Sequence, residues 1–279
     1  MTLWQGLCHL PTSWHPPMGR LLGKFLLIVA KDRKKIAQAN ISLCLSNLSA
    51  DDQKKILSNN FALLGKSIIE TGIAWFWSDA KIEKFIDYEI FGLDLLSIEN
   101  STKGNLIIFK HSQHLELDAR LLAINAEVYG VSRSHNSASM NKIQNKGRLS
   151  SIKGTADKDN PRKFIKWLKN GKNVLYAIDQ DYGWDNSAKL KFFNQETATI
   201  TTPKKIIDIT GSNLLFMNSY YEKNKIVLKL EALNSFGIDN KGLSQKINDF
   251  MEEKILLHPA EYLWAHRRFK STLGKSFYK

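Results

Sequence analysis

The sequence predicts an α/β fold with a mixed, mostly parallel central sheet flanked by helices, after an N-terminal helical region. From Asn105 onward, short apolar runs alternate with segments whose apolar residues recur at helical spacing. This alternation is typical of strand–helix–strand units. The 279 residues can bury one substantial core, and 43% are hydrophobic against 24% charged, as in folded proteins. We therefore expect an N-terminal segment, residues 1–35, and one domain, residues 36–279.

Five strands are expected in the domain, each an apolar run bounded by polar or turn residues. They are Asn105–Lys110, Ala126–Val131, Asn173–Ile178, Asn213–Tyr220 and Ile226–Glu231. Four helices are expected between or after them, two of which begin at a proline and stop at a glycine. They are Leu115–Ala123, Pro161–Lys169, Pro203–Thr210 and Lys241–Leu257. Ser132–Asp159 is polar, basic and aperiodic, so we expect a long loop, which in a compact domain is usually functional or mobile.

Two further helices are expected before the sheet, at Lys34–Leu45 and Asp51–Phe76. Ser49 is expected to cap the second helix, because its hydroxyl can accept from free backbone N–H groups there. Two aspartates follow in the first turn, where carboxylates suit the helix dipole. This helix ends on an aromatic cluster, Trp75–Trp77, which we expect in the core, with a lipid-facing wall as the alternative.

The first 30 residues combine apolar, aromatic and basic side chains. The apolar run Met18–Ala30 is interrupted by Arg20 and Lys24, and it is shorter than the about 20 residues that span a bilayer. No small-residue cleavage site follows, which argues against a signal peptide. Trp4 and Trp14 suit a membrane interface, and the KDRKK cluster after the run suits an anionic leaflet. We expect an interfacial anchor; an amphipathic core helix or a truncated spanning helix are the alternatives.

The chain carries a formal net charge of +13, from 40 lysines and arginines against 27 acids. Such an excess predicts an acidic partner, whether nucleic acid, anionic lipid or an acidic protein. The alternative is that a low-GC genome has enriched lysine on solvated faces. The basic residues are spread along the chain and do not form a tail, which argues against nucleic acid.

The stretch KHSQHLELDAR, Lys110–Arg120, places two imidazoles and two carboxylates at one expected strand-to-helix turn. In open α/β sheets, ligands bind at such turns beyond the carboxyl ends of strands. Glu116 lies one turn into the helix, and its side chain is expected to point back towards His111. A carboxylate on one ring nitrogen would fix the tautomer and make the other nitrogen a general base for a hydroxyl.

Other roles stay open at this turn. A histidine here can be structural, and His114 and Asp118 lie at the i, i+4 spacing of a pair on one helix face. A metal site from His111, His114 and Asp118 lacks a clear further ligand, so we expect no metal. Cys8 and Cys44 have no metal-ligand spacing and are expected as buried free thiols.

Two further groups are candidates for binding. Asp179 and Asp181 belong to the DQDYG turn, which follows an expected strand and would lie at the same edge of the sheet. Acids at such positions often only cap loops. Arg133 and Arg148 belong to the long loop and could bind phosphate or carboxylate groups, unless they are simply solvated.

These motifs together resemble a known family. His111 through Glu116 with the following Leu-x-Ala-Arg, the DQDYG turn and PAEYLWAHRRFK (Pro259–Lys270) are similar to the late acyltransferases of lipid A biosynthesis. The likeness is closest to the lauroyl-transferring type, within the glycerolipid acyltransferase superfamily and its His-x4-Asp/Glu motif. ETGIAWFW (Glu70–Trp77) and VSRS…NKGRL (Val131–Leu149) match too, so the resemblance covers nearly the whole chain.

The resemblance implies an enzyme that transfers an acyl chain from acyl carrier protein to a hydroxyl of a 3-hydroxyacyl chain on Kdo2-lipid IVA. His111 would take the proton from that hydroxyl, and Glu116 would orient His111, with no covalent enzyme intermediate and no cofactor. The family works at the cytoplasmic face of the inner membrane. Both the acidic carrier protein and an anionic membrane surface fit the positive charge of the chain.

Six side chains are candidates to bind the substrates, and the four arginines among them would hold acidic sugars, phosphates or the phosphopantetheine arm. The six are Arg133, Arg148, Asp179, Asp181, Arg267 and Arg268. The HRRF ending favours the first, lauroyl-type step. The alternatives are an acyltransferase that uses acyl-CoA or another lipid or glycolipid acceptor, and a non-catalytic membrane-binding protein of the same fold.

Overall fold

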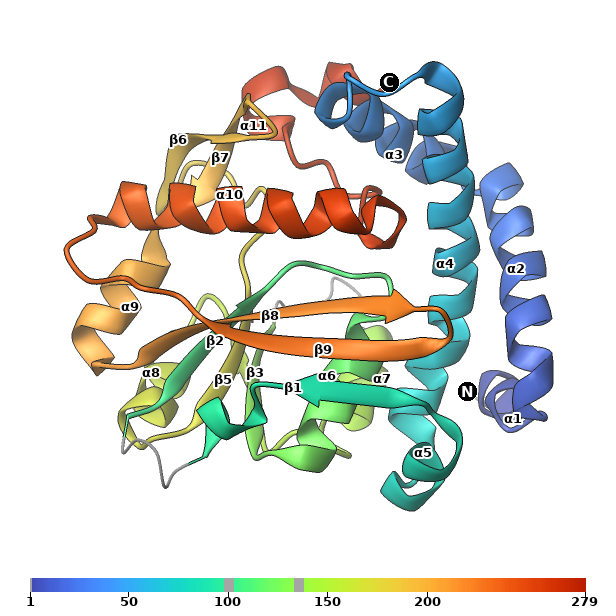
Figure 1. The fold of residues 1–279 in the computed structure, drawn as a ribbon, viewed down its shortest axis with the longest axis horizontal. Coiled ribbons are helices and arrows are strands. Elements are labelled where there is room, and N and C mark those ends of the chain that lie inside the picture. Colours follow the sequence, from blue (N-terminus) through green and yellow to red (C-terminus); the bar gives the residue numbers. More distant parts are fainter. Residues whose placement is uncertain (1, 98–102, 133–137) are drawn as a thin grey trace.

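The computed structural model describes residues 2–97, 103–132 and 138–279, and it has the expected α/β architecture (Figure 1). Within these ranges a seven-stranded sheet has the strand order β1-β9-β8-β2-β5-β3-β4. Neighbouring strands are parallel except β8 and β9, which are antiparallel. The strands are β1 (Tyr88–Phe91), β2 (Asn105–Phe109), β3 (Val128–Ser132), β4 (Thr155–Asp157), β5 (Asn173–Ala177), β8 (Asn213–Glu222) and β9 (Lys225–Ala232), and β6 (Ser187–Phe192) and β7 (Gln195–Ile200) form a separate hairpin.

Helices cover both faces of this sheet and extend beyond one end of it. Figure 1 shows α10 crossing the sheet and the long α4 beside it, with α2 on the outer side of α4. The helices are α1 (Thr2–Cys8), α2 (His15–Val29), α3 (Lys31–Cys44), α4 (Ala50–Phe76), α5 (Asp79–Phe85), α6 (Leu115–Asn125), α7 (Ala138–Arg148), α8 (Arg162–Lys169), α9 (Thr202–Thr210), α10 (Asn240–Leu257) and α11 (Lys270–Leu273), with the short 3-10 helices η1 (Thr12–Trp14), η2 (Leu93–Leu96), η4 (Pro259–Glu261) and η5 (Lys275–Tyr278).

Two apolar cores lie on opposite faces of the sheet because side chains alternate along each strand. On β2, Leu106 and Ile108 join the core formed with α8, α9 and α10. Ile107 and Phe109 join the other core, which contains the apolar residues of α6. A strand buried on both faces is therefore apolar along its length, as β2 is from Leu106 to Phe109.

The register of the central strands is fixed at their amino ends by three asparagines. Asn105 lies opposite Asn173 on one side and Asn213 on the other. Its side-chain amide donates to Asn173 Oδ1 at 2.7 Å, and Asn213 Nδ2 donates to Asn105 Oδ1 at 3.0 Å. A slip of one residue would break these bonds and exchange the two faces of the strand.

The same register decides which residues meet at the carboxyl ends. Phe109, the last residue of β2, lies opposite Ala177, the last residue of β5. His111 and Asp179 each come two residues after the end of their strand. The two strands therefore bring them out of the sheet side by side. The sheet thereby positions the candidate base beside a carboxylate.

The strands and helices expected from the sequence are confirmed, with ends displaced by a few residues. Ser49 caps α4 as expected, since its hydroxyl accepts from Asp52 N–H at 3.1 Å. The expected loop Ser132–Asp159 is wrong in part, because α7 and β4 lie within it. Sequence patterns also missed α1, α5, β1 and the β6–β7 hairpin. These elements are short or polar, so their contacts determine them more than their periodicity does.

The N-terminal helices lie against α4 through unusually close backbone contacts. A Cβ atom built on Gly65 would lie 2.2 Å from Gly19 O and 2.3 Å from Gly23 N. The outward side of α1, η1 and α2 instead exposes large apolar side chains: Leu3, Leu7, Trp14, Leu21, Phe25, Ile28 and Val29. We call these seven residues the N-terminal apolar face. Among the helices in the described ranges, none is both long and apolar enough to cross a membrane.

We expect Gly65→Ala to lower the melting temperature. The added methyl group would collide with backbone atoms of α2, and such overpacking costs about 1–3 kcal/mol. Gly6→Ala is the matched control, because a Cβ at Gly6 meets nothing within 4 Å and alanine favours a helix over glycine. Thermal unfolding of both variants measures the difference. Equal melting temperatures would contradict the close contact between α2 and α4.

Candidate active site

A pocket of about 210 Å³ opens at the carboxyl ends of β2, β3 and β5, between α6 and α7. Apolar side chains and one glycine form part of its wall, and polar side chains form the rest. The apolar part includes Trp75, Phe109, Gly130, Ile152 and Leu175, and the polar part includes His111, Glu116, Arg148, Lys158 and Gln180. The position is the one expected for a ligand site in an open α/β sheet.

His111 is held at this pocket by Asp179. The imidazole Nδ1 lies 2.5 Å from Asp179 Oδ1, and the backbone N–H of His111 donates to Asp179 Oδ2 at 2.8 Å. Because an ionised carboxylate only accepts, Nδ1 carries the hydrogen and Nε2 is left as the acceptor. Gln180 Nε2 lies 3.3 Å from that nitrogen and donates to it in this tautomer.

The carboxyl of Asp179 is ionised at neutral pH. Its burial alone would raise its pKa, but the charge of His111 and the hydrogen bonds from His111 outweigh burial and lower the pKa to about 2. The buried carboxylate therefore fixes the orientation and the tautomer of the ring. A histidine held in this way can act as a general base for a hydroxyl group.

Glu116 does not fill the position that the sequence suggested. We expected its carboxylate to bond to His111, but Asp179 occupies that place. The expected contact between Glu116 and His111 is therefore wrong. Glu116 forms an ion pair with Arg148, whose Nε lies 3.1 Å from both carboxylate oxygens, and it accepts from Trp75 Nε1 at 2.9 Å. It thereby joins α6 to α7 and α4. Glu116, Arg148 and Trp75 all line the pocket.

His114 and Asp118 form a buried structural layer behind the pocket. His114 Nδ1 donates to Asp118 at 2.6 Å, and its Nε2 donates to Glu261 at 3.1 Å. Burial opposes the charged ring, but the two carboxylates overcome it and raise the pKa of His114 to about 9. Asp118 also accepts from the Ser112 hydroxyl at 2.8 Å. The pair is thus satisfied inside the protein, in agreement with a structural role.

The C-terminal motif PAEYLW pairs with the backbone of this turn. Ser112 forms an antiparallel bridge with Tyr262. On either side of it, Leu263 N–H donates to His111 O at 3.0 Å and Gln113 N–H donates to Glu261 O at 2.9 Å. The motif therefore holds the backbone around His111, so the His111 turn and the C-terminal motif, far apart in sequence, form one unit.

The other expected substrate-binding residues divide into three groups. Asp181 is buried and accepts from the N–H and hydroxyl of Ser271, and Arg268 is buried and donates to three groups of β7. Both hold the C-terminal segment in place and neither lines the pocket, so the structure gives no support to the expected binding role. Arg267 is exposed and remains a prediction. Arg133 lies outside the described residues.

Within the part of the chain that the structure describes, no three His, Cys, Asp or Glu side chains gather as a metal site. Cys8 and Cys44 are buried and free, as expected. Burial raises the pKa of both thiols, which makes them poor nucleophiles.

Sequence reasoning missed the contacts of Asp179, Gln180 and Trp75 with the site. The sequence did contain one indication for Asp179. His111 and Asp179 each directly follow an expected strand, Asn105–Lys110 and Asn173–Ile178. The order of the strands, which makes this shared position meaningful, is not visible in local patterns. Trp75 was expected in the core or facing lipid; it packs against the core and also lines the pocket.

Comparison with known proteins agrees with this geometry. The model of the family Bacterial lipid A biosynthesis acyltransferase matches residues 1–271. The lipid A biosynthesis lauroyltransferase of Escherichia coli (strain K12) is 32% identical over 261 residues, and the palmitoleoyltransferase of the same strain is 31% identical over 260; each comparison covers 91% of this chain and 84% of the relative. A lipid A biosynthesis acyltransferase of Haemophilus influenzae is 30% identical over 279 residues, or 97% of this chain and 89% of the relative. The chain belongs to the bacterial lipid A biosynthesis acyltransferases.

Proposed function

We propose that this acyltransferase moves an acyl chain from an acyl carrier protein thioester to a hydroxyl of a 3-hydroxyacyl chain on a lipid A precursor of the Kdo2-lipid IVA type. The observation that carries the proposal is the pair of His111 and Asp179 at the mouth of a largely apolar pocket. The alternatives are acyl-CoA as donor or another lipid or glycolipid acceptor.

The reaction needs one base and no covalent enzyme intermediate. His111 Nε2 takes the proton as the acceptor oxygen attacks the thioester carbonyl, and the ionised Asp179 stabilises the resulting imidazolium. When the tetrahedral intermediate collapses, the C–S bond breaks. The imidazolium then returns its proton to the departing thiolate, so that an ester and a free thiol leave the site.

The walls of the pocket suit an acyl chain. Phe109, Ile152 and Leu175 offer apolar surface, and Gly130 has no side chain to narrow the space. We propose that Glu116 acts through Arg148, by holding α7 as a wall of this pocket. Arg148 and the exposed Arg267 are proposed contacts for the acidic groups of the substrates.

The acyl chain is proposed to be of the lauroyl type. Relatives named for lauroyl and for palmitoleoyl transfer have nearly equal identity to this chain, at 32% and 31%. The support for lauroyl therefore comes from the HRRF ending, His266–Phe269, which resembles the lauroyl type.

The proposed location is the cytoplasmic face of the inner membrane. The N-terminal apolar face supports it, because α1, η1 and α2 expose seven large apolar side chains. The basic residues Lys31 and Lys35, exposed at the start of α3, would face anionic lipid headgroups. The acceptor lipid would then reach the pocket from the membrane.

We expect His111→Ala to abolish transfer, with a fall of about 10²–10⁴-fold, because general-base catalysis is lost. The test is mass spectrometry of lipid A from a strain that lacks this protein and is complemented with each variant. The wild-type gene and His9→Ala, at an exposed histidine, should restore one secondary acyl chain, lauroyl in preference to palmitoleoyl, and His111→Ala should not. A His111→Ala protein that restores the chain contradicts the mechanism, and a palmitoleoyl chain contradicts only the lauroyl assignment.

Asp179→Asn is expected to lower kcat by about 10²-fold or more with little change in KM, because the amide no longer stabilises the imidazolium. Asp181→Asn is the matched control on the same turn. It should lower the melting temperature through its lost bonds to Ser271 and leave kcat near the wild-type value. Steady-state kinetics and thermal unfolding of both variants separate these effects. Equal kcat values for the two variants would rule out the assigned role of Asp179.

Leu21→Asp combined with Ile28→Asp should weaken binding to anionic phospholipid vesicles by about 10²-fold. Each side chain is 71% exposed, and burying one in lipid contributes about 1.5 kcal/mol or more. Phe236→Asp with Ile209→Asp is the control, since these exposed apolar residues lie outside the N-terminal apolar face. Vesicle sedimentation gives the affinities. Unchanged binding of the first variant would exclude this face as the anchor.

A further inference from the structure

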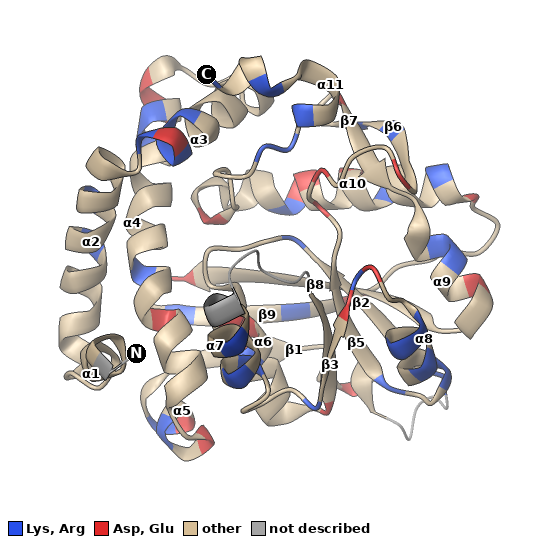
Figure 2. Cartoon of the chain, turned by 180° about the vertical axis from the view of Figure 1, so that it is seen from behind, with Lys and Arg blue, Asp and Glu red and all other residues tan. Residues whose placement is uncertain are grey.

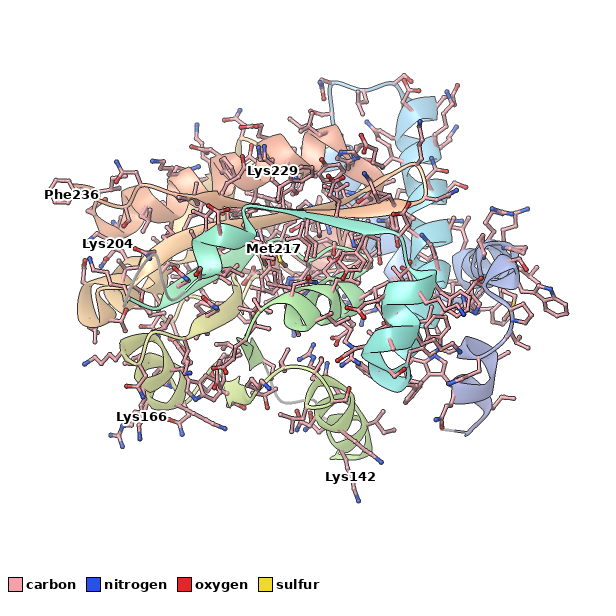
Figure 3. The ribbon with its side chains drawn as sticks, turned by 60° about the horizontal axis from the view of Figure 1, so that its bottom comes forward. Lys142, Lys166, Lys204, Met217, Lys229 and Phe236 are labelled. Atoms are coloured by element: carbon pink, nitrogen blue, oxygen red, sulfur yellow. The ribbon has the colours of Figure 1, made fainter. Side chains whose placement is uncertain are left out.

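Helix α8 presents an entirely basic outer surface. Arg162, Lys163, Lys166 and Lys169 are exposed, and α8 contains no acidic residue. We call these four residues the α8 basic face. Figure 2 shows the basic segments of α8 in blue and no acidic segment on this helix, and Figure 3 shows Lys166 pointing away from the protein. The opposite side of the helix is fixed, because Phe164 and Leu168 are buried in the core.

The charges of this face are available to a partner. Nearby acids already have cations: Asp159 pairs with Lys158, and Glu127 pairs with Lys172 at 2.7 Å. In the described ranges, no carboxylate forms an ion pair with any of the four cations of the α8 basic face. Lys54 and Lys55 of α4 differ from them, since each pairs with an aspartate of its own helix.

The α8 basic face is continuous with the mouth of the pocket. Lys163 Nζ donates to the carbonyl oxygen of Thr155 at 2.8 Å, and Thr155 lines the pocket. Lys158, which also lines the pocket, lies in the segment that leads into α8, with its ammonium 5.2 Å from the centre of the Tyr182 ring. A partner seated on α8 would therefore have the pocket directly beside it.

The direction of this face favours a soluble partner over the membrane. In Figures 1 and 2, α8 lies at the opposite side of the molecule from α1 and α2. If the N-terminal apolar face rests on lipid, the α8 basic face is turned away from the lipid. A row of unpaired cations there matches an acidic protein surface.

We propose that the α8 basic face is the docking surface for the acidic acyl carrier protein. This rests on the proposed function, in which that protein delivers the acyl chain. Docking on α8 would direct the phosphopantetheine arm past Lys158, whose ammonium suits the phosphate of the arm, and bring the thioester towards His111. Rim charges of this kind act mainly on the rate of encounter, so the docking charges should govern KM for the carrier and spare kcat.

The test combines Lys166→Glu and Lys169→Glu in the full chain. Both residues are exposed on α8, so the variant should fold as the wild type does. Lys241→Glu with Lys246→Glu, two exposed lysines of α10, is the matched control with the same change of charge. Fluorescence anisotropy with labelled acyl carrier protein should show binding weakened about tenfold or more at low salt for the α8 variant only. The difference should shrink as salt is raised.

Kinetics with two donors separate docking from chemistry. The α8 variant should raise KM for lauroyl acyl carrier protein and leave kcat, and KM for lauroyl pantetheine, near wild-type values. Unchanged carrier binding, or equal losses in the α8 and α10 variants, would overturn the docking proposal. An equal rise in KM for the small donor would also overturn it, because the pocket itself would then be altered.

The outcomes also distinguish this proposal from the proposed function. If the wild type binds the carrier through α8 but transfers only from acyl-CoA, the donor assignment fails and the docking surface stands. If the α8 variant loses binding to anionic phospholipid vesicles while keeping its affinity for the carrier, the face binds membrane and the docking proposal is wrong.

Discussion

The hydrogen bond between His111 and Asp179 depends on the register of two parallel strands. His111 and Asp179 leave β2 and β5 at equal distances from Phe109 and Ala177, which lie opposite each other. At the other end of these strands the asparagine side chains bond in pairs, so a shifted register would lose contacts at both ends. The apolar packing of both faces enforces the same alignment. Core, amino-end ladder and candidate base are therefore parts of one arrangement, and a change in any of them disturbs the site.

A second constraint is the burial of charge behind His111. Lys110 and His114 are both buried at this turn, and burial works against the charge of each. A buried charge that lacks its partner is costly, because it keeps its desolvation penalty without compensation. Glu261 supplies the second carboxylate for His114, and Lys110 Nζ donates to Ser219 O at 2.9 Å. The C-terminal motif is thus tied to the turn by electrostatics as well as by backbone pairing, and both become rigid together.

Local patterns predicted the α/β fold and the edge of the sheet where the site lies, because apolar periodicity and turn residues act over a few residues. They did not predict which carboxylate meets His111, since that depends on strands β2 and β5 being neighbours. The position of Glu116 depends on α7, which has no apolar stripe. A Cβ on Gly147 would lie 2.4 Å from the Trp75 ring, so a close backbone contact and the ion pair of Arg148 set the place of α7. Contacts between distant segments carry this information, and the chain order alone does not.

The net charge of +13 allowed two explanations, an acidic partner or lysines enriched on solvated faces. Composition cannot separate them, so the placement of the cations is the further observation to consider. Enrichment without function would scatter cations among acids, as in α4, where Lys54 and Lys55 pair with Asp51 and Asp52. On α8 the cations stand together beside the pocket, on the side away from the N-terminal apolar face. An acyltransferase that joins a lipid-borne hydroxyl to a thioester on a soluble carrier needs two approaches to one base. Separate apolar and basic faces would give each substrate its own approach, so that neither has to leave before the other can reach His111.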